Sequence, residues 1–433
     1  MKNYKLFAPI ILVVLFIASV YMTYDANGKT EARYEECLQE ARSLAAQGIV
    51  VDALVCYTEA LKLKPSLPLH MEIAQIYIET QDTRSAMNWG EVIKSTYPEQ
   101  VEGYEYMMSF HHGHENYIAC FQLADEMENR RLPMETVLPI LQDIEYTYVL
   151  KGSYHEVSVF AEARCAVLGD KSWGFLDETG AMAIPYGFTR AGSFRQGLAP
   201  VTDQDGDSYF IDTEGNRKKV ILGVESFEQL GSIEDGFFTL FDGISWGLFE
   251  GDGVQIIGGF DEVSSFTNGV VAVANDGKWR LLDSSGNVRI DKEFDGFAQD
   301  GKGVVYRNDR LFARENGCFY IMDGKGDRIS QIPFQDARLF CDTTYAAVKT
   351  DGKWGFIDGD GQMVIEPAFD DARSFSGGFA AVKTDEGWGF INEDREMVIL
   401  AQFEDAGDFN AHGCVFVKTD GMWTLLKLNK YNH

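Results

Sequence analysis

Histidines, cysteines and acidic residues are the side chains in this sequence that could hold a metal ion. His111, His112 and His114 stand close together, but they lie near a predicted turn and have no companion carboxylates at a fixed spacing. The acidic stretches at residues 203–207 and 358–361 look like the start of a calcium loop, yet neither completes the twelve-residue pattern with a terminal Glu. The seven cysteines are scattered and form no CxxC pair. We therefore expect no metal and no cofactor.

Catalytic motifs are absent from the sequence, which contains no GxSxG, no HExxH and no Walker loop. Paired carboxylates are frequent, but they stand in recurring turns, where an Asp side chain accepts backbone N–H groups and so stabilises the turn. We predict that the protein is not an enzyme. An uncharacterised hydrolase that uses two isolated carboxylates is the enzymatic alternative.

The charge balance excludes one large class of partners. The 433 residues include 38 basic and 67 acidic side chains, which gives a net charge of −29. Because nucleic-acid binding needs a basic surface that neutralises phosphates, we expect no nucleic-acid partner. The length predicts two to three domains, and the elements that build them follow in chain order.

The N-terminus predicts a membrane anchor. Lys2 and Lys5 precede residues 6–22, which are almost entirely apolar and carry no charge. Seventeen such residues are close to the shortest helix that spans a bilayer. We interpret residues 1–29 as a cytoplasmic tip and an uncleaved transmembrane signal anchor, with a cleaved signal peptide as the alternative. The positive-inside rule then predicts a single-pass protein of the cell membrane with residues 30–433 on the extracytoplasmic side.

Residues 30–170 have the 3.6-residue periodicity of helices. A break at Gly48 and a stop at Pro65 delimit a first helical hairpin, and weaker copies follow at a spacing of 34 residues. This spacing resembles the tetratricopeptide repeat and implies an α-helical hairpin solenoid. A fourth pair is expected to turn at Gly152 and end near Gly169, with residues 154–168 helical. Such a solenoid either grips a peptide or partner protein or serves as a spacer.

From Trp173 the periodicity changes to that of β-strands, and the chain repeats itself about every 35 residues. Segments such as WGFLDETG, WGLFEGDG and WGFIDGDG recur, and Ser208 and Phe319 fill two gaps in the series of tryptophans. Asp followed three residues later by Gly indicates a tight hairpin, and Gly after Trp leaves room for a neighbouring backbone. We assign the recurring tryptophans to the core between repeats: Trp173, Trp246, Trp279, Trp354, Trp388 and Trp423.

A second marker confirms the register of the repeat. Fifteen residues after the Trp position stands a Phe, as at Phe369 and Phe403, and a second Phe follows at Phe375 and Phe409. These spaced elements resemble the bacterial WG-repeat (KWG) family over residues 173 to about 428. The resemblance implies a β-repeat architecture and a binding or scaffolding role, and it brings no catalytic residue with it.

The repeats predict a third domain at residues 171–433, so that the whole chain is a multi-domain protein. Seven full copies and a final orphan strand from Trp423 favour a closed seven-bladed β-propeller. An open, twisted stack of β-hairpins is the alternative.

The resulting functional prediction is a membrane-anchored extracytoplasmic scaffold or binding protein that acts through protein–protein interaction. A glycan-binding or cell-wall-binding module is the first alternative. The expected partners are proteins of the cell envelope and also cell-wall polymer. Recognition should use residues that break the repeat, and the largest break, residues 300–317, contains Arg307, Arg310 and Arg314. These three arginines are the candidate site for an anionic partner, whereas the alternative is a mobile basic loop.

Overall fold

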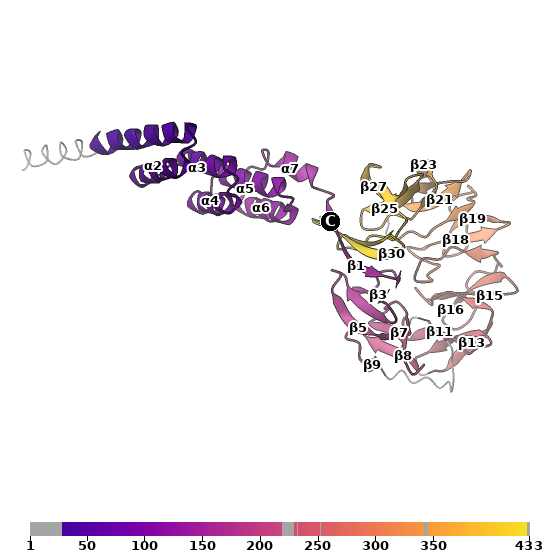
Figure 1. Cartoon of the computed structure of the whole chain (residues 1–433). Coiled ribbons are helices and arrows are strands. Elements are labelled where there is room, and N and C mark those ends of the chain that lie inside the picture. The colour runs from indigo at the N-terminus through magenta and orange to yellow at the C-terminus, as the bar shows by residue number, and fades with distance from the viewer. Residues whose placement is uncertain (1–27, 219–228, 232, 252, 342–344, 431–433) are drawn as a thin grey trace, which may run out of the picture. The chain divides into compact units, whose positions relative to one another are not determined.

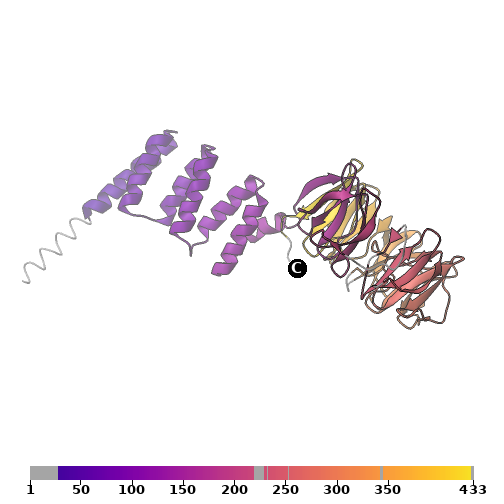
Figure 2. The same ribbon diagram turned by 90° about the horizontal axis from the view of Figure 1, so that it is seen from below.

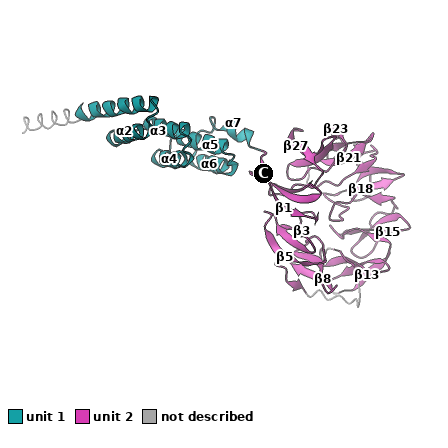
Figure 3. Ribbon diagram, viewed as in Figure 1, with its two compact units in different colours: residues 1–145 teal, residues 146–433 magenta. Residues whose placement is uncertain are grey.

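The structure is a computed structural model, and it describes residues 28–218, 229–231, 233–251, 253–341 and 345–430. The chain forms two compact units that divide between Glu145 and Tyr146 (Figure 3). The predicted boundary between residues 170 and 171 is therefore too late. The boundary differs because residues 148–168, which were expected to be helical, contain the first three strands of the second unit.

The first unit consists of helices that pack as antiparallel hairpins (Figure 2). Their spacing follows the predicted period, but the expected fourth pair does not form. Tyr104, Met108 and Cys120 lie in the buried core of this unit. The helices run through residues 28–46, α2 (Val50–Leu63), α3 (Leu67–Glu79), α4 (Thr83–Thr96), α5 (Glu102–Gly113), α6 (Tyr117–Arg130) and α7 (Leu138–Asp143).

The predicted membrane anchor at residues 6–22 lies outside the described residues. Among the helices of the described part, none has the length and apolar character that crossing a bilayer requires.

The second unit is a closed ring of β-sheets, which we call blades 1 to 8 in ring order (Figure 1). Blade 1 has β2 (Glu156–Val157), β3 (Arg164–Leu168), β4 (Trp173–Asp177) and β5 (Met182–Phe188); blade 2 has β6 (Arg190–Ala191), β7 (Leu198–Thr202), β8 (Ser208–Asp212) and β9 (Arg217–Lys218); blade 3 has β10 (Gln229–Leu230), β11 (Phe237–Phe241), β12 (Trp246–Glu250) and β13 (Gln255–Phe260); and blade 4 has β14 (Glu262–Val263), β15 (Val270–Asn275) and β16 (Lys278–Asp283). Blade 5 has β17 (Gly296–Phe297), β18 (Arg310–Glu315) and β19 (Cys318–Asp323); blade 6 has β20 (Asp336–Ala337), β21 (Ala346–Thr350), β22 (Lys353–Ile357) and β23 (Met363–Phe369); blade 7 has β24 (Asp371–Ala372), β25 (Phe379–Thr384), β26 (Gly387–Asn392) and β27 (Met397–Phe403); and blade 8 has β28 (Asp405–Ala406), β29 (Cys414–Thr419), β30 (Met422–Leu428) and β1 (Tyr148–Tyr154).

The described strands thus build eight blades, and the prediction of seven blades is wrong. The last Trp copy is not an orphan strand, because β1 pairs antiparallel with β30 and completes its sheet. In that pairing Tyr154 lies opposite Trp423. Each blade also contacts the next one all the way round, including blade 8 with blade 1. The open stack of hairpins is therefore excluded as well.

The recurring tryptophans all take the same place in their blades. Trp354 lies opposite Phe369, and Trp388 lies opposite Phe403. Trp354 also belongs to a core cluster that continues into blade 7 through Phe375, so that it packs at the junction of two blades. Trp279, Trp354 and Trp388 are buried, whereas Trp173, Trp246 and Trp423 are half-buried.

The glycine after Trp is required by the neighbouring strand. A Cβ on Gly355 would lie 2.5 Å from the carbonyl oxygen of Ile365, and one on Gly389 would lie 2.6 Å from that of Ile399. The pairing register shifts at this point in both blades, which brings the outer strand close to the glycine. Only glycine leaves space for that backbone.

Candidate binding site in the propeller channel

The innermost strand of each blade has two residues, and in most blades a tight hairpin turn follows it. In blade 2 the amide of Arg195 donates to the carbonyl of Leu198 at 2.8 Å, and the amide of Leu198 donates back at 3.0 Å. The central residues, Gln196 and Gly197, have φ angles of 48° and 74°, as in a type I′ turn. Equivalent backbone hydrogen bonds occur in blades 1, 3, 4, 5 and 7. These turns surround the channel.

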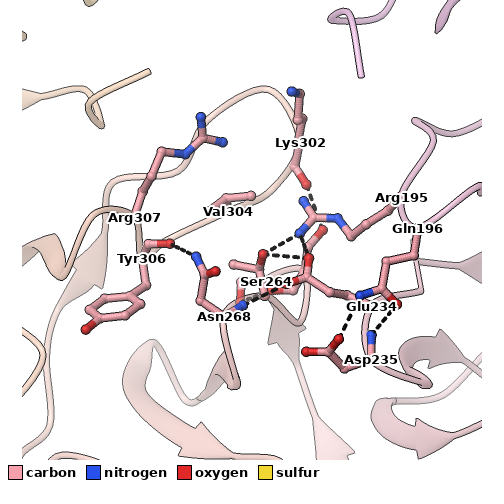
Figure 4. A network of polar contacts seen from close by, with 12 residues as sticks. Arg195, Gln196, Glu234, Asp235, Ser264, Asn268, Lys302, Val304, Tyr306 and Arg307 are labelled. Atoms are coloured by element: carbon pink, nitrogen blue, oxygen red, sulfur yellow. Dashed lines mark hydrogen bonds and ion pairs between the residues drawn. The ribbon is translucent and has the colours of Figure 1, made fainter. Parts of the chain in front are cut away.

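Polar side chains connect the turns of successive blades (Figure 4). The Glu234 carboxylate of blade 3 accepts hydrogen bonds from Arg195 of blade 2 and from Thr267 of blade 4, the latter at 2.8 Å. It also accepts one from the amide of Asn268 at 2.8 Å. The Asn268 side chain then donates to the carbonyl of Tyr306 in blade 5 at 3.1 Å. This half of the channel rim is therefore a continuous, internally satisfied network.

Blade 5 departs from the pattern, because residues 299–305 are inserted between β17 and the turn at Arg307. We call this segment the inserted turn. Its Asp300 carboxylate accepts the amides of Lys302 at 2.8 Å and Val304 at 3.0 Å, as the Asp residues of the outer hairpin turns do. The second oxygen of Asp300 forms an ion pair with Arg307 at 2.7 Å. These bonds hold the inserted turn in one shape.

The inserted turn crosses the channel. On one side, Ser265 of blade 4 donates from its amide to the Gly303 carbonyl at 2.8 Å and from its hydroxyl to the Lys302 carbonyl at 2.7 Å. On the other side, a Cβ on Gly301 would lie 2.8 Å from a methyl group of Val159 in blade 1. Blades 1 and 5 lie opposite each other in an eight-membered ring. The inserted turn consequently closes the middle of the channel and divides the channel opening into two parts.

A cavity of about 580 Å³ remains on one side of the inserted turn. We call it the channel cavity. Its walls come from Val159 and Phe160 of blade 1, Lys302 of blade 5, Gly377 of blade 7, and Asp408 and Asn410 of blade 8. Because these blades are not all neighbours, the cavity is a feature of the closed ring and not of any single repeat.

Two charged side chains of the channel cavity, Lys302 and Asp408, have no ion pair or side-chain hydrogen bond within the described residues. Figure 4 shows the Lys302 side chain pointing away from the network of Arg195 and Glu234. Desolvation by the surrounding blades lowers the pKa of the Lys302 ammonium, and the charge of Arg307 lowers it further. Desolvation also raises the pKa of the Asp408 carboxyl, although the side chain still reaches the cavity.

The three candidate arginines do not form one cluster. Arg307 lies in the channel cavity, where it pairs with Asp300 and donates to the carbonyl of Cys341 at 2.9 Å. Arg310 donates to the carbonyl of Gly359 in blade 6 at 2.7 Å. Arg314 is exposed near the other end of β18. Only Arg307 contributes to the cavity, and Lys302, which sequence reasoning missed, is the basic group left without a partner.

The residues considered for metal binding take ordinary structural roles. His112 contacts Asp143 at 2.8 Å, and His114 contacts the carbonyl of Phe110 at 2.7 Å. Asp203 and Asp358 accept backbone amides inside hairpin turns. No group of three or more potential metal ligands occurs in the part of the chain that the structure describes.

Four segments match the family model described as WG containing repeat: residues 173–206, 246–279, 354–387 and 388–423. These segments are WG repeats. Each WG repeat is offset from the blades, since residues 354–387 run from the third strand of blade 6 to the start of the third strand of blade 7. The offset explains why a strand from before the first WG repeat, β1, must complete the last blade.

Comparison with solved structures finds distant similarity. PorZ of Porphyromonas gingivalis, described as an essential bacterial surface component of the type-IX secretion system, is 9% identical over 63% of this chain, with a TM-score of 0.35. The match spans only 42% of PorZ. Hsv2p of Kluyveromyces lactis is 11% identical, with 57% of this chain and 96% of that chain covered and a TM-score of 0.37. No curated protein matches the chain.

Proposed function

We propose that the protein is a binding scaffold that takes its ligand in the channel cavity and catalyses no reaction. The channel cavity carries this proposal, because it brings the unpaired side chains of Lys302 and Asp408 together with residues of several blades. Its volume lies within the range of small-ligand sites, about 300–1,000 Å³. Turns from several blades form the walls, and a ring of sheets holds them at fixed positions.

The polar contacts favour binding over hydrolysis. A hydrolase with two carboxylates needs both groups available to the substrate and to water. In the channel cavity, however, Asp300 uses one oxygen for the amides of the inserted turn and the other for Arg307. Asp300 and Asp408 therefore do not form such a catalytic pair, because Asp300 is fully engaged, and the unpaired Asp408 suits ligand recognition.

We further propose a single-pass anchor at residues 6–22 that places residues 30–433 on the extracytoplasmic side, with envelope proteins or cell-wall polymer as partners. The support is the charge pattern of Lys2 and Lys5 before an uncharged apolar segment. The helical unit, with its tetratricopeptide-like spacing, then serves as an arm or as a second binding surface. The seven cysteines do not contradict export where their thiols are protected: burial raises the pKa of Cys165 to about 12.

A photo-crosslinking amino acid tests the site directly. Placed at Ala411, which lines the channel cavity, it should capture a ligand from wall digests or envelope extract. Placed at Met182, an exposed residue of the outer strand β5, it should capture little and serves as the matched control. Equal adducts from both positions, or adducts from Met182 alone, would show that the outer surface binds and that the channel cavity does not.

The proposed topology has its own test. Protease added to intact cells should degrade the protein, and mass spectrometry of the purified full chain should recover residues 1–22. A mature N-terminus near residue 21 would replace the anchor with a cleaved signal, whereas complete protection from protease would refute the extracytoplasmic location.

A further inference from the structure

The charges of the channel cavity can be assigned to partners one by one. Glu162 accepts the amide of Gly197 at 2.7 Å, and Glu178 contacts His412 at 3.1 Å. Asp300 and Arg307 neutralise each other, and Glu393 also has an interaction partner. Among the described residues that line the cavity, Lys302 and Asp408 are the charged groups whose side chains have neither an ion pair nor a hydrogen bond.

Lys302 and Asp408 stand on different walls. Lys302 belongs to the inserted turn of blade 5, and Asp408 follows the innermost strand of blade 8. Burial raises the pKa of Asp408, and the positive charges of Arg373 and, less strongly, of Lys302 oppose that rise. Lys302 and Asp408 nevertheless do not form an ion pair within 4.0 Å. A gap therefore separates a positive group from a negative group inside one cavity.

We propose that the channel cavity binds a small zwitterion, namely an amino acid or a short peptide with both ends free. The ligand carboxylate contacts Lys302, and its ammonium group contacts Asp408. This assignment rests on the proposed function and specifies its ligand class.

Desolvation gives the zwitterion its advantage over other ligands. Burial disfavours the charged forms of both side chains, as the lowered pKa of Lys302 and the raised pKa of Asp408 show. A ligand with the opposite charge at each end relieves both penalties at once, because each buried charge gains a partner. A ligand with a single charge, or a neutral sugar, relieves at most one. The apolar wall at Val159 and Phe160 leaves room for an aliphatic side chain.

Calorimetric titration of the full chain in detergent tests this inference. The panel contains alanine, di-alanine and tri-alanine, together with N-acetylated and C-amidated tri-alanine and a neutral disaccharide. At least one free zwitterion should bind, and blocking either end should weaken its binding about 10- to 100-fold, the range expected for a lost charged hydrogen bond. The three lengths distinguish a free amino acid from a peptide as the source of the zwitterion.

Variants separate the two charges. Lys302→Met and Asp408→Asn should each weaken the binding of the zwitterion by a similar factor. Both variants should fold, because neither side chain has a partner on which folding depends. Lys325→Met changes the lysine of a second Asp-Gly-Lys-Gly turn on the outer rim, and Asp360→Asn changes an exposed turn residue. Both control variants should bind like the parent.

Three results would overturn the inference: no zwitterion in the panel binds, the blocked peptides or the disaccharide bind as tightly, or Lys302→Met and Asp408→Asn bind like the parent. The comparison of blocked and free peptides uses the unchanged protein, so it remains decisive if a variant does not fold. If zwitterions fail while the crosslinker at Ala411 still captures a ligand, the binding scaffold stands and only this ligand class is refuted.

Discussion

Replacing Gly389 by alanine should destabilise the propeller through a backbone collision. A Cβ at this position would lie 2.6 Å from the Ile399 carbonyl oxygen, 2.7 Å from the Ala401 amide nitrogen and 2.8 Å from the Ala401 Cα. All three are backbone atoms of β27, so no side-chain rotation relieves the clash. Overpacking of this kind costs about 1–3 kcal/mol, and displacement of β27 weakens hydrogen bonds worth about 1 kcal/mol each. We therefore expect a loss of about 2–4 kcal/mol.

The unit that contains Gly389 has about 290 residues. An unfolding entropy of about 2.1 cal/mol/K per residue then gives roughly 0.6 kcal/mol/K for this unit, so that Tm should fall by about 3–7 °C. Differential scanning calorimetry of the full chain measures this shift. Gly187→Ala is the matched control, because a Cβ there meets no atom within 4 Å and the backbone is not left-handed. A Tm for Gly389→Ala within 1 °C of the parent would refute the explanation given for the glycine of the Trp-Gly pair.

Three further substitutions test other parts of the molecule. Trp354→Ala should lower the free energy of unfolding by about 3–5 kcal/mol in a denaturant titration, because the side chain is 4% exposed. A stable variant that has only lost ligand binding would mean that Trp354 is a binding platform. Tyr154→Ala should lower the free energy of unfolding by about 3 kcal/mol, because Tyr154 lies opposite Trp423 in the strand pair that closes the ring. An unchanged Tm would argue against closure by β1. Asp408→Asn should raise Tm at neutral pH, because a carboxyl with a raised pKa penalises the folded state above that pKa. The gain should vanish at about pH 3, below the ordinary pKa of aspartate, where Asp408 is protonated in both the folded and the unfolded state. A gain that persists there would refute the desolvation argument.

The repeat part of the fold was predictable because its markers lie close together in sequence. The Trp series with its two replacements, Ser208 and Phe319, already contains eight positions, one for each blade. The eighth blade was missed because its outermost strand comes from the opposite end of the repeats. Tyr154 and Phe160 have the same spacing as Phe369 and Phe375, but the Trp that pairs with Tyr154 is nearly the whole unit away. The surrounding Glu and Ala residues favour a helix locally, and ring closure overrides that preference.

The candidate site was less predictable for a related reason. The sequence does mark the break at residues 300–317, and its arginines attract attention because they are conspicuous in an acidic chain. Which side chains of that segment remain unpaired depends on contacts with Ser265, Val159 and Cys341, and these become neighbours only when the ring is closed. A usable sequence signal was the Asp-Gly-Lys-Gly segment at 300–303, an extra copy of a turn that otherwise belongs to the outer rim.

The pairing of β1 with β30 also determines when the ring can close during biosynthesis. β1 leaves the ribosome first among the strands of the propeller, and its partner β30 leaves last. Roughly 270 residues separate the two strands, which at about 5–20 residues per second corresponds to a delay of roughly 13–55 s. During that interval the other blades can form in order, while Tyr148–Tyr154 has no partner of its own. A nascent chain that has passed Tyr154 therefore exposes one strand that a chaperone, or a neighbouring copy of the protein, can occupy before the ring closes.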